Sequence, residues 1–266
     1  MLTLAIGDLF IPERSINLPS KFKKLLCPNP NSIPTNNKIS RVVCLGNITN
    51  SQKTLEFLHN LSPQFSIVKG EFDNSVILSQ QLSLISKKEE PIPYYNVFVC
   101  DGLRIGYTNG FQIVPRGDPL SLSAFARELD VDVLIWGGTH KVEAYTLDGK
   151  FFINPGSATG ALSFDWPDNE DYEEEHQDQP KEEIDKESNE EKGSNEEAEK
   201  REAIEQDKDV TEDNKINKGI LNEVEEMNAN IPSFCLLDAQ GNTCVLYIYT
   251  YLNGEVKVDK VTYTKE

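Results

Sequence analysis

The sequence predicts an α/β fold built from two packed β-sheets with helices on the outside. Three observations predict it: apolar strands alternate with helices early in the chain, hairpins around Asp-Gly turns follow, and three strands turned at glycines close the chain. Strands that are apolar throughout are typical of a parallel sheet buried on both faces. Two such sheets covered by helices give a four-layer α/β/β/α sandwich.

The first part of the chain alternates strands and helices. Leu2–Gly7, Ile39–Leu45 and Phe65–Val68 are short apolar runs, and each predicts a strand. Between them, Ser20–Leu26 predicts a helix, and Ser51 can cap a second helix. These units together predict a parallel arrangement of the first three strands.

The second part of the chain predicts hairpins and a closing meander. Asp101-Gly102 and Asp148-Gly149 are turn signals between apolar runs. Pro119–Leu129 has the spacing of an amphipathic helix. The predicted strands here are Asn96–Cys100, Leu103–Tyr107, Val131–Trp136, Val142–Leu147, Lys150–Ile153, Ser233–Asp238, Thr243–Tyr251 and Glu255–Tyr263.

The charge of the chain is concentrated in one segment. Between Asp165 and Glu226 there are 26 Asp and Glu against 8 Lys and Arg, which accounts for the whole formal net charge of −18. So polar a composition cannot bury a core. We therefore expect one folded domain from residues 1–162 and 230–266, and a disordered acidic insertion at 163–229. The neutral remainder lacks the basic stripe of a nucleic-acid-binding protein.

A weak amphipathic stripe lies near the end of this insertion. It is compatible with a docking helix, or with a marginal helical turn that leads back into the fold. Its apolar members are Ile216, Ile220, Leu221, Val224 and Met227.

The N-terminal segment and the cysteines predict a protein of a reducing compartment. Met1–Phe10 is apolar but short and has no basic lead, so we expect a first strand and not a signal peptide. No apolar run approaches the roughly 20 residues of a membrane span. The five cysteines are odd in number and mostly lie in apolar strands, which predicts buried thiols in a reducing compartment.

Four polar residues follow predicted strand ends: Asp8, Asn47, Glu71 and His140. Ligand sites of α/β sheets form at the carboxyl ends of strands. Two-metal hydrolases place oxygen and imidazole ligands there, around metals about 3.5–4 Å apart. These four residues are the candidate metal site.

The order of motifs resembles the calcineurin-like metallophosphoesterase superfamily. Within it, three runs resemble the small subunits of the retromer coat: Leu18–Leu26, Asn154–Ala161 and Ile231–Phe234. The likeness extends over 1–161 and 230–266, without the acidic insertion and the loops near Pro28 and Lys87. It implies the same four-layer sandwich.

The metal-binding motifs of the superfamily are degraded. Its usual catalytic histidine is replaced by Phe72, and its bridging carboxylate by the neutral amide of Asn47. Asp8, Glu71 and His140 could hold one ion weakly, but not a catalytic pair. His140 is alternatively a satisfied, partly buried histidine. The superfamily motifs stand here as Asp8-Leu9-Phe10, Gly46-Asn47, Gly70-Glu71-Phe72-Asp73, Asn109-Gly110-Phe111 and Gly137-Gly138-Thr139-His140.

The resemblance implies a non-enzymatic scaffold with no catalytic residue, bound metal or cofactor. Its main partner would be the large α-solenoid subunit of retromer, with other retromer and sorting-nexin subunits reached through the complex. It would be cytoplasmic and peripheral on endosomal membranes, retrieving cargo receptors to the Golgi. Two alternatives stay open: a residual metal-dependent phosphoesterase, and an adaptor whose acidic tract recruits a basic partner outside a coat.

We expect two separate apolar partner-binding surfaces. One is the degraded site, where Phe10 and Phe111 replace histidines and Leu25 and Leu26 end a nearby helix; this rim would seat the solenoid. The other would bind regulatory partners. Its tyrosines alternate along one strand and so share a face, unless a helix covers them. Its members are Val114, Leu236, Tyr247 and Tyr249.

Overall fold

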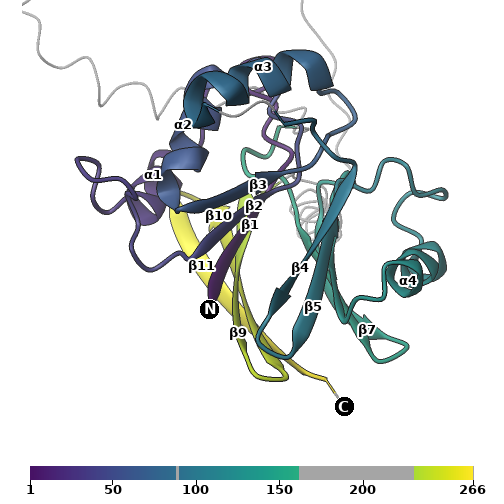
Figure 1. Ribbon diagram of the computed structural model, residues 1–266. Helices are drawn as coiled ribbons and strands as arrows, with labels where there is room; N and C mark the ends of the chain where they lie inside the picture. The colour runs from purple at the N-terminus through teal and green to yellow at the C-terminus, as the bar shows by residue number, and fades with distance from the viewer. Residues whose placement is uncertain (88–89, 162–230, 266) are drawn as a thin grey trace, which may run out of the picture. The chain divides into compact units, whose positions relative to one another are not determined.

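The computed structural model describes residues 1–87, 90–161 and 231–265, which contain two β-sheets (Figure 1). The first sheet has the strand order β11-β10-β9-β1-β2-β3 and the second β4-β5-β6-β8-β7. The first is made of β1 (Leu2–Ile6), β2 (Arg41–Cys44), β3 (Gln64–Ile67), β9 (Ser233–Gln240), β10 (Thr243–Leu252) and β11 (Glu255–Thr264). The second is made of β4 (Tyr95–Cys100), β5 (Leu103–Thr108), β6 (Val133–Ile135), β7 (Val142–Leu147) and β8 (Lys150–Pro155).

Strand β1 lies in the middle of the first sheet. It pairs in parallel with β2, which pairs in parallel with β3, as predicted. On its other side it pairs antiparallel with β9, so Leu4 lies between Val42 and Leu236. The predicted closing meander therefore completes the same sheet that the first strands begin.

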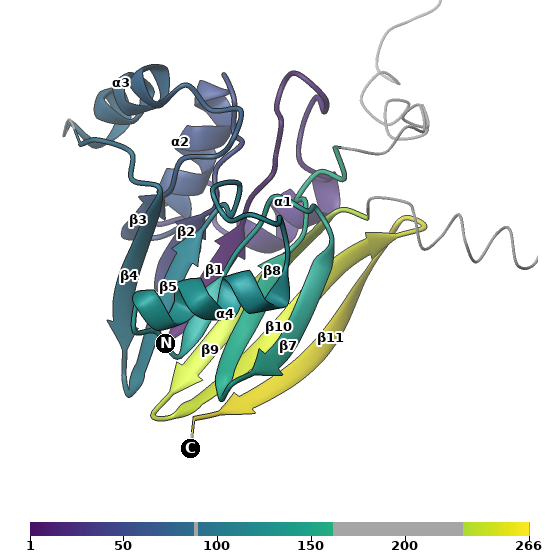
Figure 2. The ribbon, with the colours of Figure 1, turned by 90° about the vertical axis from the view of Figure 1, so that its right-hand side faces the viewer.

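Helices cover both outer faces of the sheets. Figure 1 shows α1 to α3 beside the first sheet, and Figure 2 shows α4 lying across the second. The predicted four-layer sandwich is confirmed. The helices are α1 (Ser20–Leu26), α2 (Gln52–Leu61), α3 (Ser75–Ser86) and α4 (Pro119–Glu128).

Three apolar clusters fill the spaces between the four layers. Along β2, Val42 and Cys44 pack in the cluster beneath the helices, whereas Val43 and the residue after the strand, Leu45, pack between the two sheets. Successive side chains of a strand point to opposite faces, so a strand buried on both faces must be apolar throughout. A third cluster, with Trp136 among its members, joins the second sheet to α4.

Side-chain caps mark where the longer helices begin. The Ser51 hydroxyl accepts the backbone N–H of Thr54 at the start of α2, and Asp118 accepts that of Ser121 at the start of α4. Asn74 caps α3 in the same way. The sequence pattern did not predict α3, because exposed apolar residues on other faces of the helix blur the stripe of Leu78, Leu82 and Ile85 that packs on the core.

The cysteines lie where the strand pattern places them. Cys44, Cys100, Cys235 and Cys244 are buried, Cys27 is half-buried, and all five are free thiols. Burial raises the pKa of the Cys244 thiol to about 12. Among the residues described, no helix is both long and apolar enough to cross a membrane. The predicted insertion at 163–229 and its apolar stripe lie outside the described residues.

Candidate functional site

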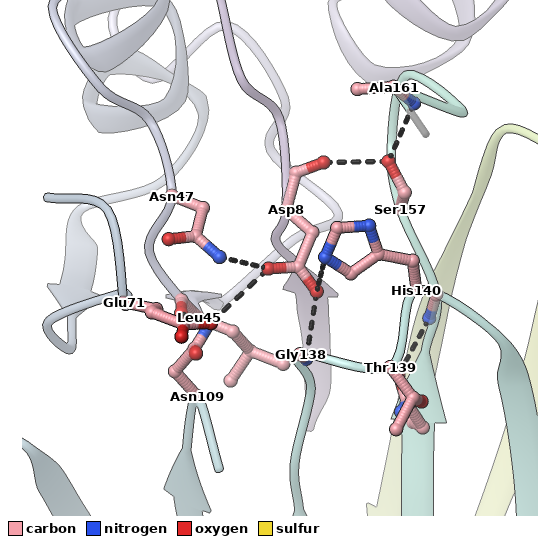
Figure 3. A network of polar contacts seen from close by, with 12 residues as sticks. Asp8, Leu45, Asn47, Glu71, Asn109, Gly138, Thr139, His140, Ser157 and Ala161 are labelled. Atoms are coloured by element: carbon pink, nitrogen blue, oxygen red, sulfur yellow. Dashed lines mark hydrogen bonds and ion pairs between the residues drawn. The ribbon is translucent and has the colours of Figure 1, made fainter. Parts of the chain in front are cut away.

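Polar side chains from several strand ends meet at one edge of the two sheets (Figure 3). Asp8 follows β1, Asn47 follows β2, Asn109 follows β5 and His140 follows β6. All four are buried, Asp8 completely. Three of the four predicted site residues thus lie together. The fourth, Glu71, instead pairs with Arg116 at 2.7 Å in the more exposed rim.

The Asp8 carboxylate is the centre of this cluster. Its Oδ1 accepts the side-chain amide of Asn47 at 2.6 Å and that of Asn109 at 3.3 Å. Its Oδ2 accepts the backbone N–H of Gly138 at 2.9 Å and lies 3.9 Å from His140 Nε2. Both carboxylate oxygens are therefore engaged by donors of this chain.

Asp73 organises the loop beside Asp8. It is buried and accepts the backbone N–H groups of Asn47 at 2.7 Å, Thr49 at 2.9 Å and Gly70 at 2.9 Å. The roles of Asp73 and Asn109 were not predicted from the sequence. Asn109 directly follows β5, and Asp73 lies in the loop between β3 and α3; these positions were the available signal.

Burial controls the charges in the site. Loss of hydration raises the pKa of Asp8, and the nearby His140 and three hydrogen-bond donors oppose this effect only in part. Burial lowers the pKa of His140, and the positive charges of Arg14 and Arg116 lower it further, against the attraction of Asp8. The environment therefore favours the neutral imidazole.

The backbone keeps an unusual conformation at the strand ends. Asp8, Asn47 and His140 have φ values of 51°, 54° and 61°, in the left-handed region. That region is sparsely populated by residues other than glycine and is often found at functional sites. The sharp turns aim these three side chains at one another.

Aromatic residues close the site from outside. Phe10 is 1% exposed, with its ring 5.2 Å from His140 and 5.5 Å from Phe72. Phe72 covers it and is 54% exposed. Phe111 contacts Tyr94 instead, at 5.9 Å. Phe10 is therefore buried beside His140, and the ring exposed at this position is that of Phe72 and not that of Phe10.

The donor set does not fit the two-metal centre that the fold family implies. Asp8 is occupied by hydrogen bonds, Asn47 directs its N–H toward Asp8, and Glu71 is paired with Arg116. In the described part of the chain, no three His, Cys, Asp or Glu side chains are grouped so as to hold a metal ion. Phe10 occupies the space beside the remaining imidazole.

The predicted second surface lies on the helix-covered face of the first sheet. Tyr247 pairs with Leu236 across strands β10 and β9, and the Tyr249 ring stacks on Phe234 at 4.7 Å. Both tyrosines are only partly buried, so α1 does not cover this face completely. Leu236 itself is 8% exposed and belongs mainly to the core.

Three residues lie in other places than expected. Leu25 is exposed on the second surface, beside a groove of about 540 Å³ that it lines with Lys21, Lys24, Glu255 and Val256. Its neighbour Leu26 is fully buried, because the next residue of a helix points to a different face. Val114 is 81% exposed in the loop between β5 and α4, so it belongs to the edge that carries the site.

Two packed sheets, outer helices and polar residues at the strand ends define the class of this protein. They are the features of a phosphoesterase-like domain. A family model, the calcineurin-like phosphoesterase superfamily domain, matches residues 31–167.

Comparison with individual proteins narrows the class. The chain is 45% identical to vacuolar protein sorting-associated protein 29 of Saccharomyces cerevisiae, over all of both chains. The crystal structure of Chaetomium thermophilum Vps29 matches all of both chains with 33% identity and a TM-score of 0.65. Entamoeba histolytica Vps29 in complex with zinc matches 98% of this chain and 99% of that one, with 28% identity and a TM-score of 0.61. The chain belongs to the Vps29 family of vacuolar protein sorting proteins.

Proposed function

We propose that this protein is a non-enzymatic scaffold subunit of the retromer coat that binds the large α-solenoid subunit. The observation that carries the proposal is that the Asp8 carboxylate is already engaged by hydrogen bonds within the chain. A carboxylate that already accepts Asn47, Asn109 and Gly138 is poorly placed to hold a catalytic metal. The membership of the Vps29 family supports a role in vacuolar protein sorting.

The solenoid would bind at the edge of the sheets that carries the degraded site. Phe72 and Val114 are 54% and 81% exposed there, and Tyr94 is 50% exposed. Large apolar residues exposed at one edge of the molecule favour a protein interface. Phe111 contributes as a half-buried support for Tyr94. Phe10 lies beneath Phe72 and would act by holding its ring in place.

Regulatory partners would use the second surface. Tyr247 and Tyr249 offer partly exposed aromatic surface, and Leu25 borders the adjacent groove. A structure of Chaetomium thermophilum Vps29 holds a cyclic peptide, which supports peptide binding in this family. Leu236 would contribute through the core side of this face, and Leu26 only by anchoring α1.

The remaining partners would be reached through the complex. Other retromer subunits and sorting nexins would join by way of the solenoid, and the protein would lie on endosomal membranes from the cytoplasmic side without entering the bilayer. In this role the coat would retrieve cargo receptors to the Golgi.

A residual phosphoesterase is the second candidate, and the zinc complex of the Entamoeba histolytica relative favours it. Removal of one transition-state contact commonly costs about 10²–10³ in rate, and several ligands are missing here together. We expect no metal-dependent hydrolysis of a generic phosphodiester with saturating Mn²⁺ or Zn²⁺. Hydrolysis by the wild-type chain that is abolished in Asp8→Ala would show that the protein is a phosphoesterase.

Binding to the purified solenoid subunit, measured by calorimetry, tests the scaffold function directly. We expect a stable one-to-one complex without added metal. Failure of the wild-type chain to bind would refute the proposed function.

A further inference from the structure

Arg14 occupies an unusual position above the degraded site. Its guanidinium lies over the ring of Phe10 at 4.9 Å and over that of Phe72 at 5.6 Å. Such cation–π contacts hold the planar group against the aromatic faces and leave its N–H groups directed outward. The turn from Phe10 to Ser15, closed by backbone bonds from Arg14 and Ser15 to the Phe10 carbonyl, fixes where the side chain begins.

The Arg14 guanidinium has no carboxylate within salt-bridge distance among the described residues. The side chain is exposed, and it lies close enough to His140 to lower the pKa of that imidazole. The nearby Arg116 differs, because Glu71 already pairs with it at 2.7 Å. The two aromatic rings thus hold the Arg14 guanidinium in place, and its N–H groups can donate hydrogen bonds to a partner.

The surroundings of Arg14 add a second cation and an apolar surface. Lys69 lies over the rings of Tyr94 and Phe111, at 5.2 Å and 5.7 Å, and makes no salt bridge with the described residues. Phe72, which follows Lys69 closely in the chain and lies under the Arg14 guanidinium, is 54% exposed. The edge therefore presents aromatic rings capped by unpaired positive charge, although Glu13 precedes Arg14.

We propose that Arg14 is a carboxylate receptor for the coat subunit, recognising an Asp or Glu next to an apolar side chain that packs on Phe72. The inference rests on the proposed function and specifies the chemistry of its interface. A guanidinium fork binds a carboxylate through two parallel hydrogen bonds, and burial by the apolar contact around it strengthens them. The positive charges of Arg14 and Lys69 favour an acidic segment of the solenoid over the part of a second copy of this chain outside Asp165–Glu226, which is neutral overall.

The test measures the affinity of the purified solenoid subunit for the full chain and for four variants of it. We expect Arg14→Glu to weaken binding at least tenfold and Arg14→Lys several-fold, because lysine keeps the charge but loses the fork. The matched control is Lys24→Glu, an exposed cation beside the groove on the other surface, with unchanged affinity expected. Thermal melting checks that each variant remains folded. If Arg14→Glu does not fold, the uncharged variant Arg14→Gln takes its place in the comparison.

A charge exchange separates recognition from a structural role of Arg14. We expect one Asp or Glu of the solenoid, changed to Lys, to restore binding to Arg14→Glu. The salt dependence of wild-type binding should be steeper than that of Arg14→Gln. Wild-type affinity in Arg14→Glu would overturn the inference while leaving the scaffold function intact. The inference would also be overturned if the chain self-associates and Arg14→Glu abolishes that self-association.

Discussion

The side-chain amide of Asn47 donates to the carboxylate of Asp8 across 2.6 Å, and this bond joins the ends of the neighbouring parallel strands β1 and β2. Because the bond is buried, its polarity matters: an acceptor at position 47 would face an acceptor at position 8. The neutral amide thus stabilises the two strand ends without a cation.

We predict that Asn47→Asp is strongly destabilising. The change places two carboxylates in a buried contact, and one must take up a proton or move. The expected loss is about 3–5 kcal/mol of unfolding free energy, as for other unpaired buried charges. Urea denaturation in the presence of a chelator measures it. Asn253→Asp, in an exposed turn, is the control; equal stability of the two variants would contradict the prediction.

His140 makes stability depend on pH. Because its pKa is lowered in the folded state, the unfolded chain takes up a proton first as the pH falls through the ordinary value of 6.5. The stability that depends on the neutral imidazole is therefore complete above 6.5 and is lost as the pH falls toward the lower folded pKa. Denaturation at a series of pH values should give a steeper acid loss for wild type than for His140→Gln. Parallel curves would assign the acid loss to other groups.

Two exposed valines distinguish the proposed surfaces. Val114 is 81% exposed on the edge that carries the degraded site, and Val258 is 50% exposed on β11 of the first sheet. We predict that Val114→Asp weakens binding to the solenoid at least tenfold, about 1.4 kcal/mol, because the charge must be buried in the interface. Val258→Asp should bind normally. The reverse result, measured by calorimetry on folded variants, would place the coat on the other surface.

The acidic insertion should be dispensable for folding. The described chain leaves at Ala161 and returns at Ile231, and shortening a loop changes closure entropy only slowly. Replacing Asp165–Met227 by a short Gly/Ser linker should keep the melting temperature within a few degrees, as measured by calorimetric melting. Insoluble protein from the shortened chain would mean that the insertion packs on the domain.

The strands were predictable because both of their faces are buried, which makes their sequences apolar throughout. Val42 to Leu45 must be apolar at every position when helices cover one face and a second sheet the other. Helix α3 was not predictable in this way, since Val76, Ile77 and Leu84 are apolar but exposed and weaken the contrast between its buried and exposed faces.

The site was predictable in composition but not in its contacts. Strand ends indicated Asp8, Asn47 and His140, because carboxyl ends of parallel strands share an edge. Nothing local distinguished Phe10, which is buried, from Phe72, which covers it. Likewise Val114 could not be assigned to a surface, because that depends on how a loop packs after the sheet has formed.

The central position of β1 has a consequence for the order in which the chain can fold during synthesis. This strand is made first, yet β9, one of its two neighbours, is made near the end. At about 5–20 residues per second, one edge of β1 remains without its partner for roughly ten seconds or more. An open strand edge promotes pairing between chains. The acidic run from Asp165 to Glu226 is synthesised within that interval, so nascent chains carry their greatest like charge, and repel one another most, just before the edge is closed.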